Sequence, residues 1–140
     1  MVIQEEINDL YGLSNSMIGI AGMNELKGKY PVALKYYLQA LQVKKDLEEF
    51  DGISHCHLNI ALLYEKMNKH ELALENFLKA EKICLETHSR FSIKSIYEGM
   101  SVCYNSLGQY EKAYNYMKAF SELKDSIFST ESNGQIAEMQ

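Results

Sequence analysis

The sequence of 140 residues contains no tryptophan, one proline (Pro31), and no apolar run close to the roughly 20 residues that a membrane-spanning helix needs. Because proline is so scarce, few positions force a helix to break. The first ten residues, MVIQEEINDL, lack the basic start and apolar stretch of a signal peptide. The 46% apolar and 24% charged residues are ordinary for one folded domain of this length.

Positive charge is also scarce. Fourteen Lys and Arg residues stand against 19 Asp and Glu residues, which gives a net charge of −5. Because nucleic acids and anionic membranes are bound mainly through Lys and Arg, we expect neither as a partner. The three cysteines, Cys56, Cys84 and Cys103, are odd in number and widely spaced. They are typical of reduced, mostly buried thiols in an intracellular protein.

The sequence does have clear self-similarity, with a period of 40 residues. Three segments superpose on one another: GKYPVALKYYLQAL from Gly28, NKHELALENFLKAE from Asn68 and GQYEKAYNYMKAFS from Gly108. Two small-residue positions recur in this frame, one at Ala33, Ala73 and Ala113 and the other at Ala21, Ala61 and Ser101. Such repetition is typical of stacked supersecondary units, each of which buries its apolar faces against its neighbours.

Each repeated unit is predicted to form two helices. Residues such as Ile53, His57, Ile60 and Tyr64 recur at the three- and four-residue spacing of one helical face. A turn of the form Gly/Asn-x-Tyr/His follows, and a second helix then carries Ala73 and Phe77. The predicted fold class is therefore all-α, with antiparallel helix pairs stacked into a superhelix.

This pattern resembles the tetratricopeptide repeat (TPR). The shared features are the two small-residue positions, an aromatic residue at Tyr64 and Tyr104, and Gly-x-Tyr turns at residues 28–30 and 108–110. A bulky apolar position at Tyr37, Phe77 and Met117 and an alanine at Ala40 and Ala80 complete the match. The departures are Asn24 for an aromatic residue, Asn68-x-His70 for Gly-x-Tyr, and Phe120 for a third alanine.

The period is longer than the usual TPR length of about 34 residues. The surplus lies between Ala40 and Ser54, and again between Ala80 and Lys94, so we expect a longer second helix and a longer loop after it. HEAT or armadillo arrays would also suit a period near 40. The placement of alanine and tyrosine favours the TPR interpretation.

Both ends of the chain are predicted to lie outside the three repeats. Residues 1–12 align with residues 41–52, so they are interpreted as the tail of a preceding repeat or as an N-terminal capping helix. After Phe128 the repeat frame fails, and Ser129 is predicted to cap a further helix. The predicted units are 1–12, then repeats at 13–52, 53–92 and 93–128, then the start of a C-terminal linker or capping helix at 129–140. This division predicts about seven or eight helices.

The last segment, SELKDSIFSTESNGQIAEMQ, carries a narrower resemblance. It is similar to the segment that follows 40-residue TPRs in sensor histidine kinases and LuxR-type regulators, mainly from Bacteroidetes. In those proteins the segment leads into a coiled coil and an output domain. The resemblance implies that this chain is the input or interaction region of a bacterial signal-transduction protein of the two-component type. The alternative is a free-standing TPR adaptor with no output domain.

The sequence contains no recognisable catalytic pattern. His55 and His57 are two residues apart on a predicted helix, so their side chains point about 200° apart and cannot share a metal ion. Cys103 and His70 are of nucleophile and base type, but nothing in the sequence places them together. Phosphate loops, Ser-His-Asp orders and paired-carboxylate motifs are missing. We therefore predict a non-enzymatic protein with no cofactor and no metal site. The acidic run from Asp46 to Asp51 is interpreted as a solvated helix end, with a ligand role as the alternative.

By analogy with the TPR family, the first helix of each pair lines a concave groove. The candidate ligand-binding residues are Asn15, Ile18, Gly22 and Glu25 in the first repeat, His55, Leu58, Asn59, Leu62 and Glu65 in the second, and Ser95, Glu98, Val102 and Asn105 in the third. For Leu58, Leu62 and Val102 the alternative is packing against neighbouring helices.

The resemblance also implies which ligands fit poorly. Family members that bind chaperone tails hold a C-terminal carboxylate with Lys, Arg and Asn. The matching positions here are Ile18, Gly22, Asn59, Ser95 and Gly99, of which only Asn59 has a suitable side chain. A neutral or mildly basic peptide therefore suits the groove better.

The predicted partner is a protein or peptide ligand, with the terminal helices as candidates for a homodimer contact. Neither nucleic acid nor membrane contact is expected. The three thiols favour the cytoplasm. The resemblance to membrane-bound regulators leaves the periplasm as the alternative compartment.

Overall fold

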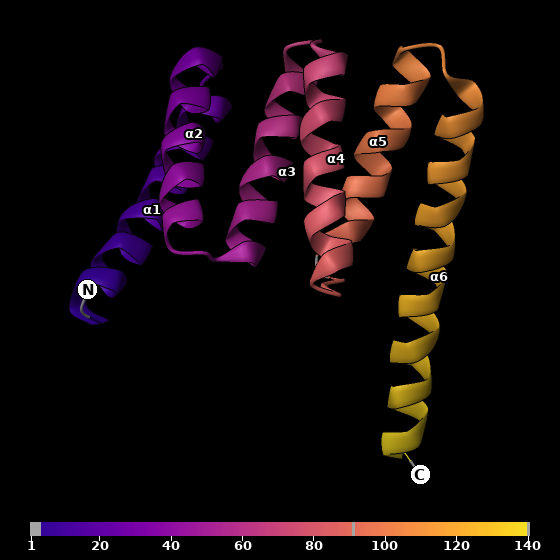
Figure 1. Ribbon diagram of the computed structural model, residues 1–140. Coiled ribbons are helices and arrows are strands. Elements are labelled where there is room, and N and C mark those ends of the chain that lie inside the picture. The colour runs from indigo at the N-terminus through magenta and orange to yellow at the C-terminus, as the bar shows by residue number, and fades with distance from the viewer. Residues whose placement is uncertain (1–3, 91, 140) are drawn as a thin grey trace.

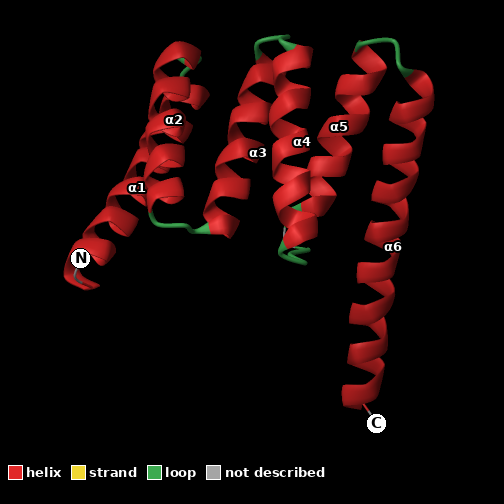
Figure 2. Ribbon diagram, in the orientation of Figure 1, coloured by secondary structure: helices red, strands yellow, loops and turns green. Residues whose placement is uncertain are grey.

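The computed structural model describes residues 4–90 and 92–139, and this part of the chain forms helices joined by short turns (Figure 1). The helices are α1 (Gln4–Leu26), α2 (Tyr30–Asp46), α3 (Phe50–Lys66), α4 (His70–Glu86), α5 (Ile93–Ser106) and α6 (Tyr110–Met139). Figure 2 shows helix and loop only over these described residues. The predicted all-α fold class is confirmed.

The helices form a row of antiparallel pairs. Helices α1 and α2, α3 and α4, and α5 and α6 pack within pairs, while α2 packs on α3 and α4 packs on α5 between pairs. In Figure 1 the stack therefore runs from α1 at one end to α6 at the other. Helix α3 also contacts α5, so the first helices of the second and third pairs lie beside each other.

The predicted turn pattern, Gly/Asn-x-Tyr/His, lies at each of the three turns that join the two helices of a pair. Gly28 and Gly108 adopt φ angles of 76° and 78°, the left-handed conformation that ends many helices. Asn68 takes the same conformation with φ 59°, because asparagine tolerates this region better than most residues. The departure at Asn68 therefore leaves the turn geometry unchanged. Pro31 lies in the first turn of α2, where no intrahelical N–H bond is lost.

The 40-residue period has a simple origin. Helices α2, α3 and α4 each contain 17 residues, and the turns between them are short. The extra residues are shared between the end of α2 and the start of α3, which begins at Phe50. Before α3 the prediction of a longer loop is therefore wrong, since the surplus lengthens both helices there. After α4 it is right, because α4 ends at Glu86 and α5 begins only at Ile93.

The described residues form six helices rather than the predicted seven or eight. Helix α1 continues through Gly12, and α6 continues through Ser129 without a break. Neither segment contains proline, and an isolated glycine in a helix costs only about 1 kcal/mol relative to alanine. Both terminal segments therefore extend the neighbouring helix. Residues 1–3 and 140 of the predicted terminal units lie outside the described residues.

Two apolar clusters hold the stack together. The first joins α1 and α2 to α3, and contains Ala33, Tyr37 and Ile60. The second joins α3 and α4 to α5 and α6, and contains Phe77 and Met100. Every predicted small-residue position is buried, namely Ala21, Ala33, Ala40, Ala61, Ala73, Ala80, Ser101 and Ala113. The three cysteines are buried and free, as predicted.

Candidate functional site

Helices α1, α3 and α5 together present one surface, which we call the first-helix face. Residues that are 40 positions apart occupy the same register on these helices and form rows across the face. One row is Asn15, His55 and Ser95; a second is Gly22, Leu62 and Val102; a third is Glu25, Glu65 and Asn105. The ion pair between Lys66 Nζ and Glu25 Oε2, at 2.9 Å, ties α3 to α1 across the third row.

Most of the predicted ligand-binding residues are accessible on this face. The exposed members are Asn15, His55, Leu62, Ser95, Glu98, Val102 and Asn105, and the half-buried members are Ile18, Gly22, Glu25, Asn59 and Glu65. For Leu58 the structure supports the alternative of packing against neighbouring helices. It is only 6% exposed and belongs to the second apolar cluster, so its side chain packs against the core rather than facing a ligand.

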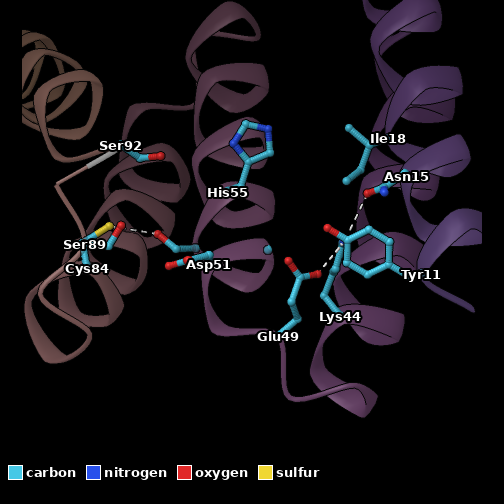
Figure 3. Close-up of a pocket in the computed structure, with 12 residues that line it drawn as sticks. Tyr11, Asn15, Ile18, Lys44, Glu49, Asp51, His55, Cys84, Ser89 and Ser92 are labelled. Carbon is cyan, nitrogen blue, oxygen red and sulfur yellow. Dashed lines mark hydrogen bonds and ion pairs between the residues drawn. The ribbon is translucent and has the colours of Figure 1, made fainter. Parts of the chain in front are cut away.

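A cleft of about 270 Å³ lies at one end of the face, between α1 and α3 (Figure 3). Three predicted residues line it: Asn15, Ile18 and His55. Figure 3 shows Ile18 and His55 on opposite sides of this opening. The remaining lining comes from Tyr11, Lys44, Glu49, Asp51, Gly52, Ser54, Cys84, Ser89 and Ser92.

Lys44 forms the fixed floor of the cleft. Its ammonium lies 2.6 Å from Glu49 Oε2, donates a hydrogen bond to Asn15 Oδ1 at 3.1 Å, and lies 4.1 Å from the centre of the Tyr11 ring. The Lys44 residue is only 2% exposed. Because a carboxylate, an amide and an aromatic face already surround this cation, it is poorly placed to attract an anionic ligand.

Two accessible polar groups of the cleft that are not engaged with Lys44 lie on α3. Asp51 and His55 are both exposed and are four residues apart, so they share one side of the helix. Ser54, one residue earlier than His55, points into the core instead, where its hydroxyl lies 3.1 Å from Cys84 Sγ. The cleft therefore offers one carboxylate and one imidazole to solvent above a neutralised floor.

The other half of the face is an apolar strip flanked by carboxylates. Leu62 and Val102 are 36% and 40% exposed and occupy the same register on α3 and α5. Burial raises the pKa of the Glu65 carboxyl, and the carboxylate of Glu98 acts in the same direction. His70 opposes this shift. The strip can therefore receive an apolar side chain next to a basic one.

Sequence reasoning missed Lys44 as a cleft residue, and it gave Asp51 a ligand role only as the alternative to a solvated helix end. Asp51 is in the register of Tyr11 and one helical turn before His55, so its spacing could have indicated the position. Lys44 comes from a second helix, at the position that Cys84 occupies in the next repeat. A lysine at a buried repeat position implies a nearby counter-ion, and this was the available signal.

Chemistry elsewhere in the described chain is sparse. Burial raises the pKa of Cys56 to about 11 and that of Cys103 to about 12, so both thiols are poor nucleophiles at neutral pH. Among the residues that the structure describes, no three His, Cys, Asp or Glu side chains gather closely enough to hold a metal ion. None of the described helices has the length and hydropathy needed to cross a bilayer.

Stacked antiparallel pairs with an open first-helix face define a helical-repeat scaffold. Two family models, both described as tetratricopeptide repeat, match residues 12–86 and 95–126. The first match alone spans more than half of the chain. The chain therefore belongs to the tetratricopeptide repeat family, whose members generally mediate protein–protein interactions.

Solved structures share the fold at low sequence identity. The TPR domain of Arabidopsis FLU superposes with a TM-score of 0.80 at 14% identity, covering 84% of this chain and 98% of that one. A structure of MamA gives 0.70 at 15% identity, with 89% and 70% covered. The first TPR of Spaghetti (RPAP3) bound to the HSP90 peptide SRMEEVD gives 0.68 at 16%, with 91% and 93% covered. A search of curated proteins found no match.

Proposed function

We propose that this chain is a scaffold whose first-helix face binds an extended peptide segment of neutral or mildly basic character. The observation that carries the proposal is the exposed pair Leu62 and Val102, flanked by the carboxylates of Glu65 and Glu98. A similar fold in the first TPR of Spaghetti has a bound peptide, which supports a peptide as the type of ligand.

The two halves of the face would act differently on such a segment. The apolar strip removes a ligand side chain from water, which supplies affinity in rough proportion to the apolar area that is buried. Glu65 and Glu98 favour a Lys or Arg next to that side chain and disfavour an acidic residue there. Asp51 and His55 hydrogen-bond the part of the segment that enters the α1–α3 cleft.

The proposal is tested with a peptide library that varies in charge and apolar content, followed by fluorescence anisotropy on the enriched peptides. We expect enrichment of peptides with one large apolar residue beside a Lys or Arg. The Glu98→Lys variant should weaken their binding about tenfold, because it replaces an attraction by a repulsion. Val102→Asp should weaken it at least as much by placing a charge in the apolar strip.

A matched control lies on the other side of the stack. Glu75→Lys makes the same charge change on α4, where Glu75 is exposed and pairs with Lys79 at 3.6 Å. This variant should bind like the wild type. Enrichment of acidic peptides, or equal losses in Glu98→Lys and Glu75→Lys, would contradict the assignment of the site.

We further propose that the scaffold is the input region of a bacterial signal-transduction protein, with α6 carrying the response onward. Helix α6 has 30 residues against 17 in α2 and α4, and it extends well past the other helices in Figure 1. Its final segment also carries the resemblance to sensor kinases and LuxR-type regulators. Sequencing the gene on both sides of this region should show an output domain in frame after Gln140. A stop codon there, together with a co-purifying partner, would favour the adaptor alternative.

A further inference from the structure

The interface between repeats occurs twice within the chain. At its first occurrence, α3 places Ile53, Ile60 and Leu63 into the cluster formed with α1 and α2, and these side chains are at most 8% exposed. At its second occurrence, α5 places Ile93, Met100 and Cys103 into the cluster formed with α3 and α4, and these are at most 6% exposed. Each first helix thus buries the same three register positions against the preceding pair.

Helix α1 has apolar residues at the same three positions, but their side chains are exposed to solvent. Leu13 is 46% exposed, Ile20 is 42% exposed and Met23 is 60% exposed. They lie 40 residues before Ile53, Ile60 and Leu63. The outer side of α1 is therefore one half of the interface between repeats, and no other part of the described chain covers it.

The missing half lies at the opposite end of the stack. Met117 of α6 is 44% exposed, whereas its equivalents Tyr37 and Phe77 are 4% and 0% exposed beneath the following helix. Tyr114 is 65% exposed, although the equivalent leucines of α2 and α4 are half-buried. Together with Val102 and neighbouring residues, Met117 and Tyr114 line a groove of about 320 Å³ between α5 and α6.

The two exposed surfaces also match in shape. Inside the chain, the Phe77 ring lies against Gly99, where an added Cβ would overlap with the ring. Gly19 has the same register on α1, and nothing lies within 4 Å of the place where its Cβ would be. The empty space beside Gly19 on α1, which we call the glycine notch, therefore corresponds to the exposed large side chain of Met117 on α6.

The charges match in the same register. Lys44 pairs with Glu49 at 2.6 Å next to the α2–α3 interface. The equivalent positions, 80 residues after Lys44 and 40 residues before Glu49, are Lys124 on α6 and Asp9 on α1, both exposed. Helix α1 contains acidic residues and no Lys or Arg, whereas residues 110–124 of α6 contain three lysines and two glutamates.

We propose that the open groove of α5 and α6 is a docking surface for a second copy of this chain, which enters it with the outer side of its α1. Leu13, Ile20 and Met23 of the second copy cover Tyr114 and Met117 of the first, and Met117 lies against Gly19. The contact joins two different surfaces, so it continues the stack head to tail and leaves one open surface at each end of the assembly.

The test uses two variants of the full chain, each of which blocks one surface. Met117→Asp places a charge in the α5–α6 groove, and Gly19→Gln fills the notch on α1. Both sites are accessible, so circular dichroism and thermal unfolding should show that both variants fold. In analytical ultracentrifugation, the wild type should associate further as its concentration rises from micromolar to millimolar. Each variant alone should bind itself at least about tenfold more weakly, a typical loss at a central interface residue.

Mixing the two variants gives the decisive result. Each contributes its intact surface, so the mixture should form a one-to-one complex of twice the 16.1 kDa chain mass and grow no further. A wild type that stays monomeric throughout overturns the proposal and leaves these surfaces to other partners. Self-association of Gly19→Gln at wild-type strength also overturns it, because that result indicates a symmetric contact through α6.

Charge reversal tests the register independently. Lys124→Glu should weaken wild-type association about two- to fivefold, the range for an exposed ion pair. Combining it with Asp9→Lys should restore the association, because the pair is re-formed with its signs exchanged. If the double variant is as weak as the single one, Lys124 does not meet Asp9 and the proposed register is wrong.

Discussion

At the scale of single residues, buried polar groups are matched to specific partners. His57 is 6% exposed, and its Nδ1 lies 3.0 Å from Asn76 Oδ1. The Asn76 amide nitrogen donates to the Leu72 carbonyl oxygen, which leaves Asn76 Oδ1 as the acceptor for His57. The histidine ring therefore carries its proton on Nδ1 and serves as a neutral link between α3 and α4.

The pH dependence of stability should report this neutral histidine. Burial lowers the pKa of His57, with the Asn76 hydrogen bond opposing and Lys79 and Lys45 adding to the shift. A lowered pKa means that the unfolded chain binds more protons, so the stabilisation is present above the ordinary histidine pKa and is lost as pH falls through the folded value. Urea unfolding of the wild type should show this loss below about pH 6.5.

The control for this prediction is the His57→Gln variant, measured over the same pH range. Burial raises the pKa values of Glu65 and Glu81, which favours the folded state as pH falls and so acts in the opposite direction. Both glutamates are present in both proteins, so the difference between the two curves isolates His57. Parallel curves below pH 6.5 would show that the ring is protonated as easily in the folded state as in the unfolded chain.

At the scale of elements, Gly19 and Gly99 occupy the same position of the repeat, one in open space and one in a packed interface. Substitutions at the two sites therefore separate the effect of packing on stability from that of helix propensity. Gly99 on α5 lies under the fully buried Phe77 ring of α4, which cannot move aside. Gly99→Ala should therefore lower the free energy of unfolding by about 1–3 kcal/mol, the usual cost of overpacking. Gly19→Ala is the matched control in open space on α1, and it should raise stability by up to about 1 kcal/mol through helix propensity. Urea titrations of both variants check the pair, and a gain in both would contradict the contact.

The elements show how far the sequence determines the fold. Alternating small and large residues, such as Ala73 with Phe77, predicted the helix pairs because close packing requires both at fixed spacing. The helix boundaries that the sequence predicted near Gly12 and Ser129 are wrong, because α1 and α6 continue through these residues. Those predictions rested on the repeat frame, whereas helices stop only where a turn residue or lost packing stops them. The left-handed turns at Gly28 and Asn68 meet that condition, and Gly12 does not.

The candidate site was less predictable than the fold. Register alone placed Asn15, His55 and Val102 on the accessible surface, because a helix fixes which side each position faces. It could not separate Leu58 from Leu62, since burial there depends on how closely α5 approaches α3. The cleft floor also escaped prediction, because Lys44 on α2 meets partners from α1 and from the turn before α3, which the repeat pattern does not bring together.

At the scale of the whole molecule, Tyr64 joins the two apolar clusters. It packs against the cluster of α1 and α2 and also against that of α4, α5 and α6. In a stack of repeats, cooperativity depends on such contacts between neighbours. Tyr64→Ala should therefore remove stability from both sides at once, by about 3 kcal/mol in total for the loss of a large aromatic side chain.

Loss of Tyr64 should change the shape of the unfolding transition as well as its midpoint. Because α1 and α2 would be held to the rest of the stack by fewer contacts, hydrogen exchange of their amides should accelerate more than that of the amides of α4 and α5. The urea transition should broaden, with a lower dependence on denaturant concentration as the two clusters unfold separately. Tyr64→Phe keeps the ring and should retain one sharp transition. Equal acceleration of exchange in all helices of Tyr64→Ala would show that the stack unfolds as one unit without this contact.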